Sequence, residues 1–434
     1  MTVKPCLLFC SILVLMAVLI GSAALAVGQT ESVLYSFTDG TQGATPNGNL
    51  VADGAGNLYG TTLGGGEFFG GNVYEMVPPV PPSTQWTQTV IYTFTAGSDG
   101  GNPSAGVIFD AAGNLYGTTS SGGTSDYGTV FRLSPPSTSG GQWTESTLYS
   151  FLEGSSDGAD PEAGVVFDKA GNLYGTTFEG GITNTTSCTK GCGVVFKLTP
   201  PASGGEWTES VIEYFNYGNG GYPRGTLILD PSGNFYGTTL YGGQYGGGVI
   251  FRLTPPSKPG HAWGYRVLYA FGATTTDSSE PWAGLTLRKG VLYGAASLGG
   301  PYRGGTVFQL VGPTKSGEPW TENILLNFDG NDGYFPNGNV IFDKSGNLYG
   351  TTMFGGLLGN CDPEILGCGV VFELSPPKLA GGSWTDTILH SFPTTQDDGM
   401  RAVGGLLIGN NGALFGVTQS GITATDGTVF EIVK

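Results

Sequence analysis

Aromatic and arginine side chains in the loops are the residues of this chain best suited to bind another molecule. An aromatic face beside acids and amides can stack on a sugar ring or grip a peptide. Trp282 is the most informative of them, because it is the only tryptophan outside a position that recurs along the chain. The alternative is that these side chains only cover the bases of their loops. The candidate binding residues are Phe69, Tyr127, Tyr222, Arg224, Tyr241, Tyr245, Trp282, Tyr302, Arg303, Tyr334 and Phe354.

Acidic residues in the loops could hold a cation or move a proton. Several stand in Asp-Gly patterns, as in SDGGNP at 98–103, which is typical of turns. Oxygen ligands on glycine-rich loops also suit calcium, although the spacing does not match an EF-hand. Two of the acids could alternatively form the carboxylate pair of a glycoside hydrolase. We expect turn formation to explain them and no cofactor to be bound. The unrepeated acids are Asp39, Asp99, Asp157, Asp160, Glu162, Asp277, Glu280, Asp329, Asp332, Asp397 and Asp398.

Residue patterns for nucleophilic or metal-assisted catalysis are missing from the sequence. The chain has two histidines: His261 lies in a loop, and His390 lies in a segment expected to be an outer strand. We expect both to be solvated or packed. No GxSxG, HExxH or P-loop pattern occurs. The sequence therefore predicts no catalytic residue and favours a binding protein over an enzyme.

The first 26 residues have the features of a secretory signal peptide. Lys4 supplies a positive charge, residues 7–20 are apolar, and the Ala-Leu-Ala at 24–26 is typical of a cleavage signal. No second apolar run is long enough to span a membrane. We expect cleavage near Ala26, and an exported mature chain, residues 27–434, without a membrane-inserted segment.

Cysteines and charge agree with export. Two close pairs follow the signal peptide, Cys188 with Cys192 and Cys361 with Cys368, and an even number in an exported chain predicts a disulfide within each pair. A zinc site is the alternative, but no histidine lies near either pair. The net charge of −17 disfavours nucleic acid and anionic membranes as partners.

One heptapeptide recurs through the chain. GNLYGTT occurs at 56–62, 113–119, 171–177 and 346–352, and looser copies occur at 233–239, 290–296 and 412–418. Each copy belongs to a unit of four short segments, written in one unit as GVIFD, NLYGTT, GTVFRL and WTESTLYSF. The segments are rich in Val, Ile, Phe, Tyr and Thr and are separated by Gly, Pro, Asp and Asn, which indicates strands joined by turns. Four strands in each of seven units predict an all-β fold, a seven-bladed β-propeller.

The phase of the repeat favours a closed ring over a linear solenoid. The mature chain opens with QTESVLYSF at 29–37, which is a fourth segment without the other three. It closes with GTVFEIVK at 427–434, which is a third segment without a fourth. We expect the N-terminal strand to complete the last blade, because this pairing covers an exposed sheet edge.

Within each unit, repeated residues are expected to build structure. The Asp of D-x-x-G-N should start a tight turn, and Gly60 and its equivalents should leave room where an aromatic side chain crosses the strand. The six tryptophans at 86, 143, 207, 263, 320 and 384 share one position and should pack at the start of the outer strand.

The unit DxxGNLYGTTxxGG…GTVFxLxPP…W…LYxF resembles a family of bacterial tandem-repeat proteins, often called GloVer-containing or choice-of-anchor repeat proteins. The resemblance covers essentially the whole mature chain and implies a secreted or surface protein with a propeller-like repeat. It implies no activity and no catalytic residues. Family members carry varied C-terminal anchoring segments, whereas this chain ends on a strand at Lys434. We therefore expect release or periplasmic retention.

The sequence thus predicts a secreted recognition or scaffold module. We expect a monomer that binds a polysaccharide or an extracellular protein on its loop face. An extracellular carbohydrate-active hydrolase or lyase that uses loop carboxylates is the first alternative, and a purely structural surface protein is the second.

Overall fold

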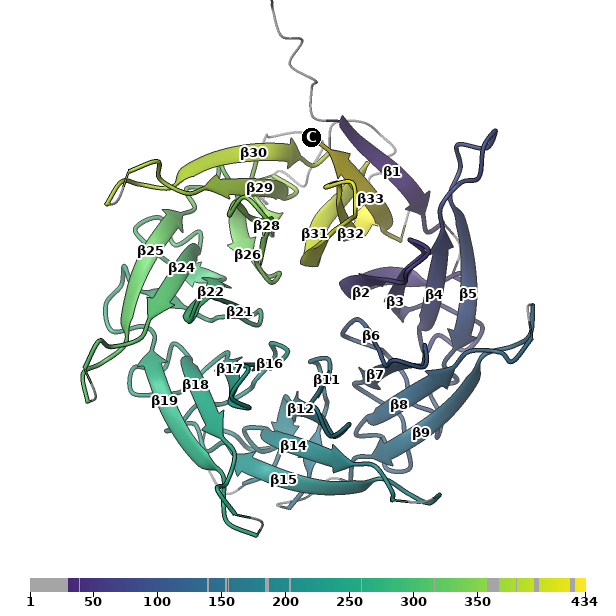
Figure 1. Ribbon diagram of the computed structural model, residues 1–434, viewed down its shortest axis with the longest axis horizontal. Coiled ribbons are helices and arrows are strands. Elements are labelled where there is room, and N and C mark those ends of the chain that lie inside the picture. Colours follow the sequence, from purple (N-terminus) through teal and green to yellow (C-terminus); the bar gives the residue numbers. More distant parts are fainter. Residues whose placement is uncertain are drawn as a thin grey trace, which may run out of the picture.

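Seven antiparallel sheets surround a central axis in the computed structural model of the protein (Figure 1). The predicted seven-bladed β-propeller is confirmed, and the described residues include no helix. The structure describes residues 30–38, 40–138, 140–152, 154, 156–183, 187–202, 204–258, 260–315, 317–356, 367–379, 381–393, 398–421 and 426–434.

Each blade follows the same order from the axis to the rim. In the first three blades these strands are β2 (Ala44–Ala52), β3 (Leu58–Gly64), β4 (Asn72–Val77) and β5 (Thr87–Thr93); β6 (Ile108–Phe109), β7 (Leu115–Thr119), β8 (Thr129–Ser134) and β9 (Thr144–Ser150); and β11 (Val166–Phe167), β12 (Leu173–Thr177), β14 (Val194–Thr199) and β15 (Thr208–Tyr214).

The next three blades repeat this order. Their strands are β16 (Ile228–Leu229), β17 (Phe235–Thr239), β18 (Val249–Thr254) and β19 (Gly264–Ala270); β21 (Thr286–Arg288), β22 (Val291–Ala296), β24 (Thr306–Val311) and β25 (Thr321–Asn327); and β26 (Tyr334–Pro336) with β27 (Ile341–Phe342), β28 (Leu348–Phe354), β29 (Val370–Ser375) and β30 (Thr385–Ser391). Two short ribbons lie in the loops, β10 (Gly158–Ala159) with β13 (Glu179–Gly180) and β20 (Ser278–Ser279) with β23 (Leu298–Gly299).

The seventh blade joins the two ends of the described chain. It consists of β31 (Gly399–Ile408), β32 (Leu414–Gly421), β33 (Thr428–Val433) and, outermost, β1 (Thr30–Ser36) (Figure 1). Strand β1 pairs antiparallel with β33 from Thr30 opposite Val433 to Ser36 opposite Thr428. The predicted ring closure is therefore confirmed.

The heptapeptide forms the second strand of each blade, and its tyrosine is tied to the preceding turn. In the second blade the Asp110 carboxylate accepts hydrogen bonds from the Ala112 and Asn114 amides at 2.8 and 2.9 Å. It also accepts one from the Tyr116 hydroxyl at 3.1 Å. Burial alone would raise the pKa of Asp110, but these hydrogen bonds outweigh it and lower the pKa. The repeated Asp is thus a turn residue, as predicted.

The glycine and the threonines of the heptapeptide serve packing within and between blades. A Cβ atom on Gly117 would lie 2.6 Å from Cζ of Phe131, so glycine is required where this ring crosses the strand. The Thr118 hydroxyl donates a 2.9 Å hydrogen bond to the Ala163 carbonyl of the next blade. The Thr119 hydroxyl accepts one from the Thr129 amide at 3.2 Å. The seven copies therefore carry shape rather than chemistry.

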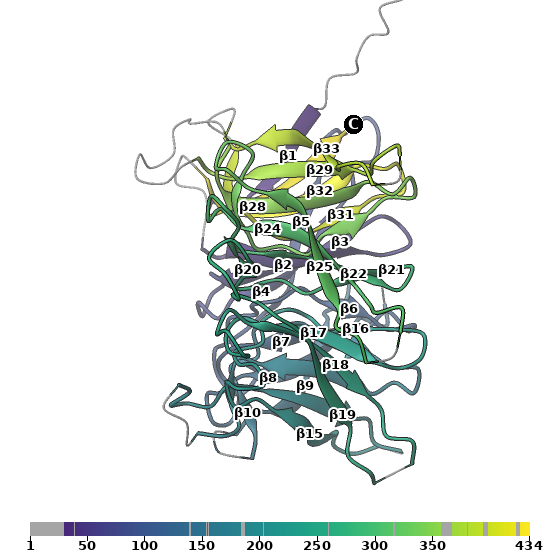
Figure 2. The same ribbon diagram turned by 90° about the vertical axis from the view of Figure 1, so that its left-hand side faces the viewer.

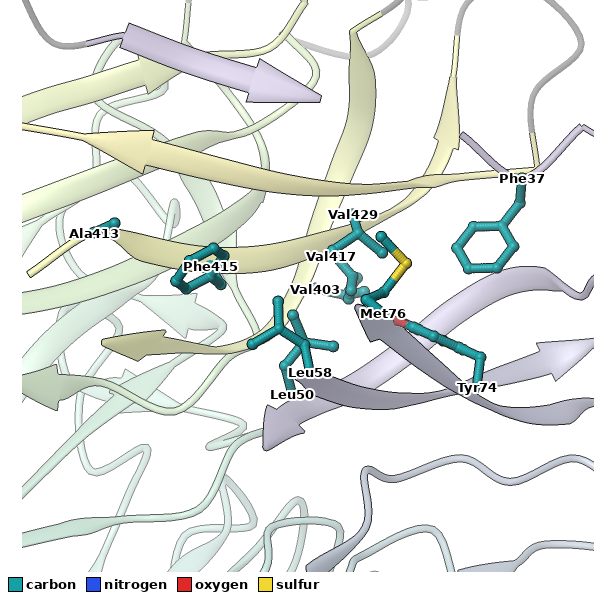
Figure 3. Close-up of a cluster of buried hydrophobic side chains, with 10 residues drawn as sticks. All are labelled: Phe37, Leu50, Leu58, Tyr74, Met76, Val403, Ala413, Phe415, Val417 and Val429. Atoms are coloured by element: carbon teal, nitrogen blue, oxygen red, sulfur yellow. The ribbon is translucent and has the colours of Figure 1, made fainter. Parts of the chain in front are cut away.

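Hydrophobic clusters fill the space between neighbouring blades. Figure 3 shows the cluster at the closure, where side chains of the last blade meet those of the first. Phe37 of the closing segment is fully buried there, with its ring centroid 5.3 Å from that of Tyr74. The repeated tryptophans pack in the same way: Trp143 lies edge-on to Tyr59 of the preceding blade, with centroids 6.3 Å apart.

The disulfide between Cys188 and Cys192 is confirmed, with Cα atoms 5.1 Å apart. The predicted 361–368 disulfide cannot be placed, because Cys361 lies outside the described residues, as do Asp39, Asp397 and the predicted signal peptide at 1–26. Among the described residues there is no helix long and apolar enough to cross a membrane.

Candidate ligand site in the central channel

A cavity of about 690 Å³ occupies the centre of the ring, and residues from all seven blades line it. Part of its lining comes from one segment, X-Pro-X, which leads into the innermost strand of each blade. The residue after the proline lines the cavity in every blade, and Ala402 replaces the proline in the seventh. We call these seven residues the channel ring: Asn47, Ser104, Glu162, Arg224, Trp282, Asn337 and Val403.

The residue before the proline is held in an unusual backbone conformation in every blade. Its φ lies between 55° and 61° in all seven cases, a region that side chains other than glycine rarely adopt. Its amide also donates to a carbonyl of the preceding blade, as Asp160 does to Tyr127 at 3.0 Å and Glu280 does to Gly247 at 2.9 Å. Neighbouring blades thus fix the same turn seven times, and the turn aims the channel ring inward.

Backbone packs against backbone directly after the channel ring. A Cβ atom on Gly106 would lie 2.1 Å from the Asn49 carbonyl oxygen, and one on Gly404 would lie 2.6 Å from the Gly48 oxygen. Amide side chains join the blades at the same level, where the Asn339 Oδ1 accepts a 2.8 Å hydrogen bond from Gly284. Assembly of the blades thus restricts these positions, whereas the side chains of the channel ring differ from blade to blade.

The charged part of the site lies on the third and fourth blades. Arg224 Nε lies 2.5 Å from Glu162 Oε2, and both side chains are largely buried. Burial raises the pKa of Glu162 to about 7, although the charge of Arg224 acts in the opposite direction. Burial first, then the charge of Glu179, raises the pKa of Asp160 to about 6. Two carboxyl groups that can hold or release a proton near neutral pH thus share the cavity with a guanidinium.

Aromatic rings continue the site over the fifth and sixth blades. The Arg224 guanidinium lies 3.9 Å from the centroid of the Trp282 ring, a close cation–π contact. The Trp282 ring in turn lies 5.6 Å from that of Phe335, and Phe335 lies 6.2 Å from Phe354. The ion pair and the aromatic rings therefore form one continuous surface. We call it the Glu162–Phe354 strip, and it consists of Glu162, Arg224, Trp282, Phe335 and Phe354.

The structure brings three of the predicted binding residues to the cavity: Arg224, Trp282 and Phe354. Tyr222 and Tyr241 contact each other, with ring centroids 6.0 Å apart, but do not line the cavity. Tyr334 lies on β26 beside the strip, opposite Phe354.

The other predicted residues do not line the cavity. Phe69, Tyr245 and Tyr302 are exposed, with 78%, 49% and 64% of their surfaces accessible, and Arg303 is also exposed. Tyr127 packs against the core between the second and third blades.

Two of the loop acids named from the sequence lie away from the cavity. Asp99 and Asp157 lie at the rim and accept hydrogen bonds from Tyr92 and Tyr149, each at 2.9 Å. The candidate binding residues left out Phe335, and they left out Asn47, Ser104 and Asn337 of the channel ring because only aromatic and arginine side chains were weighted. Aligning the units on the X-Pro-X segment would have revealed one variable position beside one nearly invariant proline.

The repeat itself decides the family. The profile of the Gloeobacter/Verrucomicrobia repeat matches residues 23–189, 79–280 and 261–434, which together span nearly the whole chain. The protein belongs to this family. The predicted resemblance is thereby confirmed. No curated protein matches the chain.

Solved structures share the fold of this Gloeobacter/Verrucomicrobia repeat protein. A virginiamycin B lyase from Staphylococcus aureus is 12% identical with a TM-score of 0.53, over 94% of this chain and 99% of the lyase. The extracellular domain of a proposed one-component system from B. thetaiotaomicron is 12% identical with a TM-score of 0.51, over 93% of this chain and 42% of that one. At such identities the likeness shows the propeller fold alone.

Proposed function

We propose that this repeat protein is a secreted recognition protein that binds a segment of a polysaccharide in its central channel. One observation carries the proposal: the channel ring differs from blade to blade, whereas the proline before it recurs in six blades and the residue after it is Gly or Ala in all seven. A repeat that served only as structure would have no reason to vary at the one position that lines a cavity in every blade.

The chemistry of the cavity suits a sugar chain. Trp282 and Phe354 offer apolar faces for pyranose rings. Glu162 and Arg224 offer charged hydrogen-bonding groups, and Asn337 adds an amide. The volume of about 690 Å³ falls within the ~300–1,000 Å³ of small-ligand sites, so a few sugar residues would fill it. The Cys188–Cys192 disulfide supports export to the compartment where polysaccharides occur.

Replacing Trp282 by alanine should weaken binding to the recognised glycan about tenfold to a hundredfold, because the aromatic centre of the strip is lost. Binding is measured on a glycan array and then by calorimetry with the best oligosaccharide. Tyr302→Ala is the matched control, since this aromatic loop residue is exposed and lies outside the cavity. Equal losses in the two variants would contradict a channel site, and binding of peptides but not of any glycan would identify a protein ligand instead.

A second candidate function, a hydrolase or lyase, is favoured by the two carboxyl groups with raised pKa values in the cavity. A carboxyl with a pKa near 7 can donate or accept a proton at neutral pH. If the protein cleaves the glycan, Glu162→Gln should reduce turnover at least a hundredfold while binding persists. Product formation from the bound polysaccharide, followed by reducing-end assay, is the measurement. Wild-type protein that binds without any turnover would leave recognition as the function.

A further inference from the structure

Three ligand atoms of metal-binding type meet at the rim between the sixth and seventh blades. They belong to Glu31 on β1, His390 on β30 and Asp398 just before β31, and all lie within 4.8 Å of one another. The His390 Nε2 lies 3.0 Å from Asp398 Oδ2, and Asp398 is 1% exposed. The Glu31 Oε1 is buried and has no hydrogen-bond partner among the described residues.

The equivalent rim positions of the other blades show how this cluster differs from them. The seventh residue of an outer-strand segment can meet both a loop residue and the third residue of the next outer segment. Between the fourth and fifth blades the Tyr269 hydroxyl lies 3.2 Å from Asp277 and 3.1 Å from Glu322. The phenol there bridges both carboxylates. Of the seven equivalent residues, His390 is the one that carries an imidazole: Tyr35, Tyr92, Tyr149, Glu213, Tyr269, Leu326 and His390.

We propose that Glu31, His390 and Asp398 form a binding site for a divalent transition-metal ion, with zinc as the best match. An imidazole nitrogen and carboxylate oxygens are zinc ligands, and three such ligands leave a position for water. The carboxylate oxygen of Glu31 that lacks a partner would gain one. Calcium suits the site less well, because it prefers six to eight oxygen ligands and does not favour imidazole.

The ion would act on the closing strand. Glu31 lies on β1, which is held in the ring by its pairing with β33, whereas His390 lies on the outer strand of the preceding blade. A metal bound by both would tie β1 to the sixth blade as well as to its own. The closing strand would then be fixed on two sides, and its release would require loss of the metal.

The test is a titration of the full chain, freed of metal by a chelator, with zinc chloride. One zinc per chain should bind, and about a hundredfold excess over the Kd should raise the unfolding temperature of a chain of this length by roughly 3 °C. Cobalt chloride should give the visible absorption of a bound Co²⁺ ion.

His390→Tyr is the matched control, because tyrosine is the residue that bridges the carboxylates at the equivalent places. This variant should keep its fold, bind no zinc at the site and show no zinc-dependent rise. Glu31→Gln should weaken zinc binding tenfold or more while leaving the ring closed. The proposal is overturned if the wild-type protein shows no zinc response, or if His390→Tyr responds to the same extent.

Discussion

Replacing Phe37 by alanine should lower the free energy of unfolding by about 3–5 kcal/mol. Phe37 is fully buried between the closing strand and the first blade, against Tyr74. Its amide and carbonyl bond Gly427 and Asp426 at 2.9 and 2.7 Å, so its side chain packs at the point where the ends of the ring meet. The measurement is urea unfolding followed by tryptophan fluorescence.

Phe151→Ala is the matched control for this prediction. Phe151 is also fully buried and ends the outer-strand segment of the second blade, but there the chain is continuous through the blade. Both variants should lose similar packing energy. Only Phe37→Ala should also speed hydrogen exchange of the β1 amides, because this strand can leave the ring without unfolding a whole blade. Equal exchange of β1 in the two variants would contradict a closure that depends on Phe37.

The architecture could be predicted from the sequence because the same local pattern of strand and turn residues recurs in seven units. Turn residues such as Asp110, the crossing glycine Gly117 and the pairing of β1 with β33 follow from the order of the segments alone. Each needs only neighbouring strands, and each is fixed by steric fit or hydrogen bonding within a hairpin or between adjacent strands.

The site could be predicted only in part, because it depends on the direction in which each loop turns. Tyr302 and Trp282 look alike in sequence, yet the first lies exposed on a loop between strands and the second lines the cavity. Trp282 belongs to an X-Pro-X segment, in which Glu280 has a positive φ and donates its amide to Gly247 of the preceding blade, whereas Tyr302 lies in the loop between β23 and β24. The rim contact of His390 was missed for a related reason, since its partners come from two other segments.

The free energy of unfolding should fall as pH rises from 5 to 8, the second large effect we expect. Carboxyl groups meet in pairs at the rim, where a glutamate of one outer strand faces the loop aspartate before it. Burial, followed by the charge of the facing aspartate, raises the pKa to about 7 for Glu145, beside Asp99, and for Glu209, beside Asp157. Burial and the charge of Asp277 also raise the pKa of Glu322 to about 7, although a hydrogen bond from Ser278 acts to lower it.

The direction of this pH effect follows from the number of protons that the folded and the unfolded states bind. Between about pH 4.5 and 7 the folded protein keeps protons on these glutamates that the unfolded chain has released, so raising the pH through this window lowers the free energy of unfolding. Below pH 4.5 both states are protonated and the difference vanishes. Solvent screening at the partly exposed rim reduces each contribution, so the unfolding temperature should be about 4–8 °C lower at pH 8 than at pH 5.

The triple variant Glu145→Gln, Glu209→Gln and Glu322→Gln isolates the rim pairs. Glutamine has the shape of the protonated carboxyl and can still donate to the facing aspartate, but it does not ionise. The variant should therefore match the wild-type protein near pH 5, exceed it at pH 8 and lose most of the slope between them. Calorimetry across this range is the measurement. A variant with the same slope as the wild-type protein would show that the titrating groups lie elsewhere, with Asp160 and Glu162 in the channel as the next to replace.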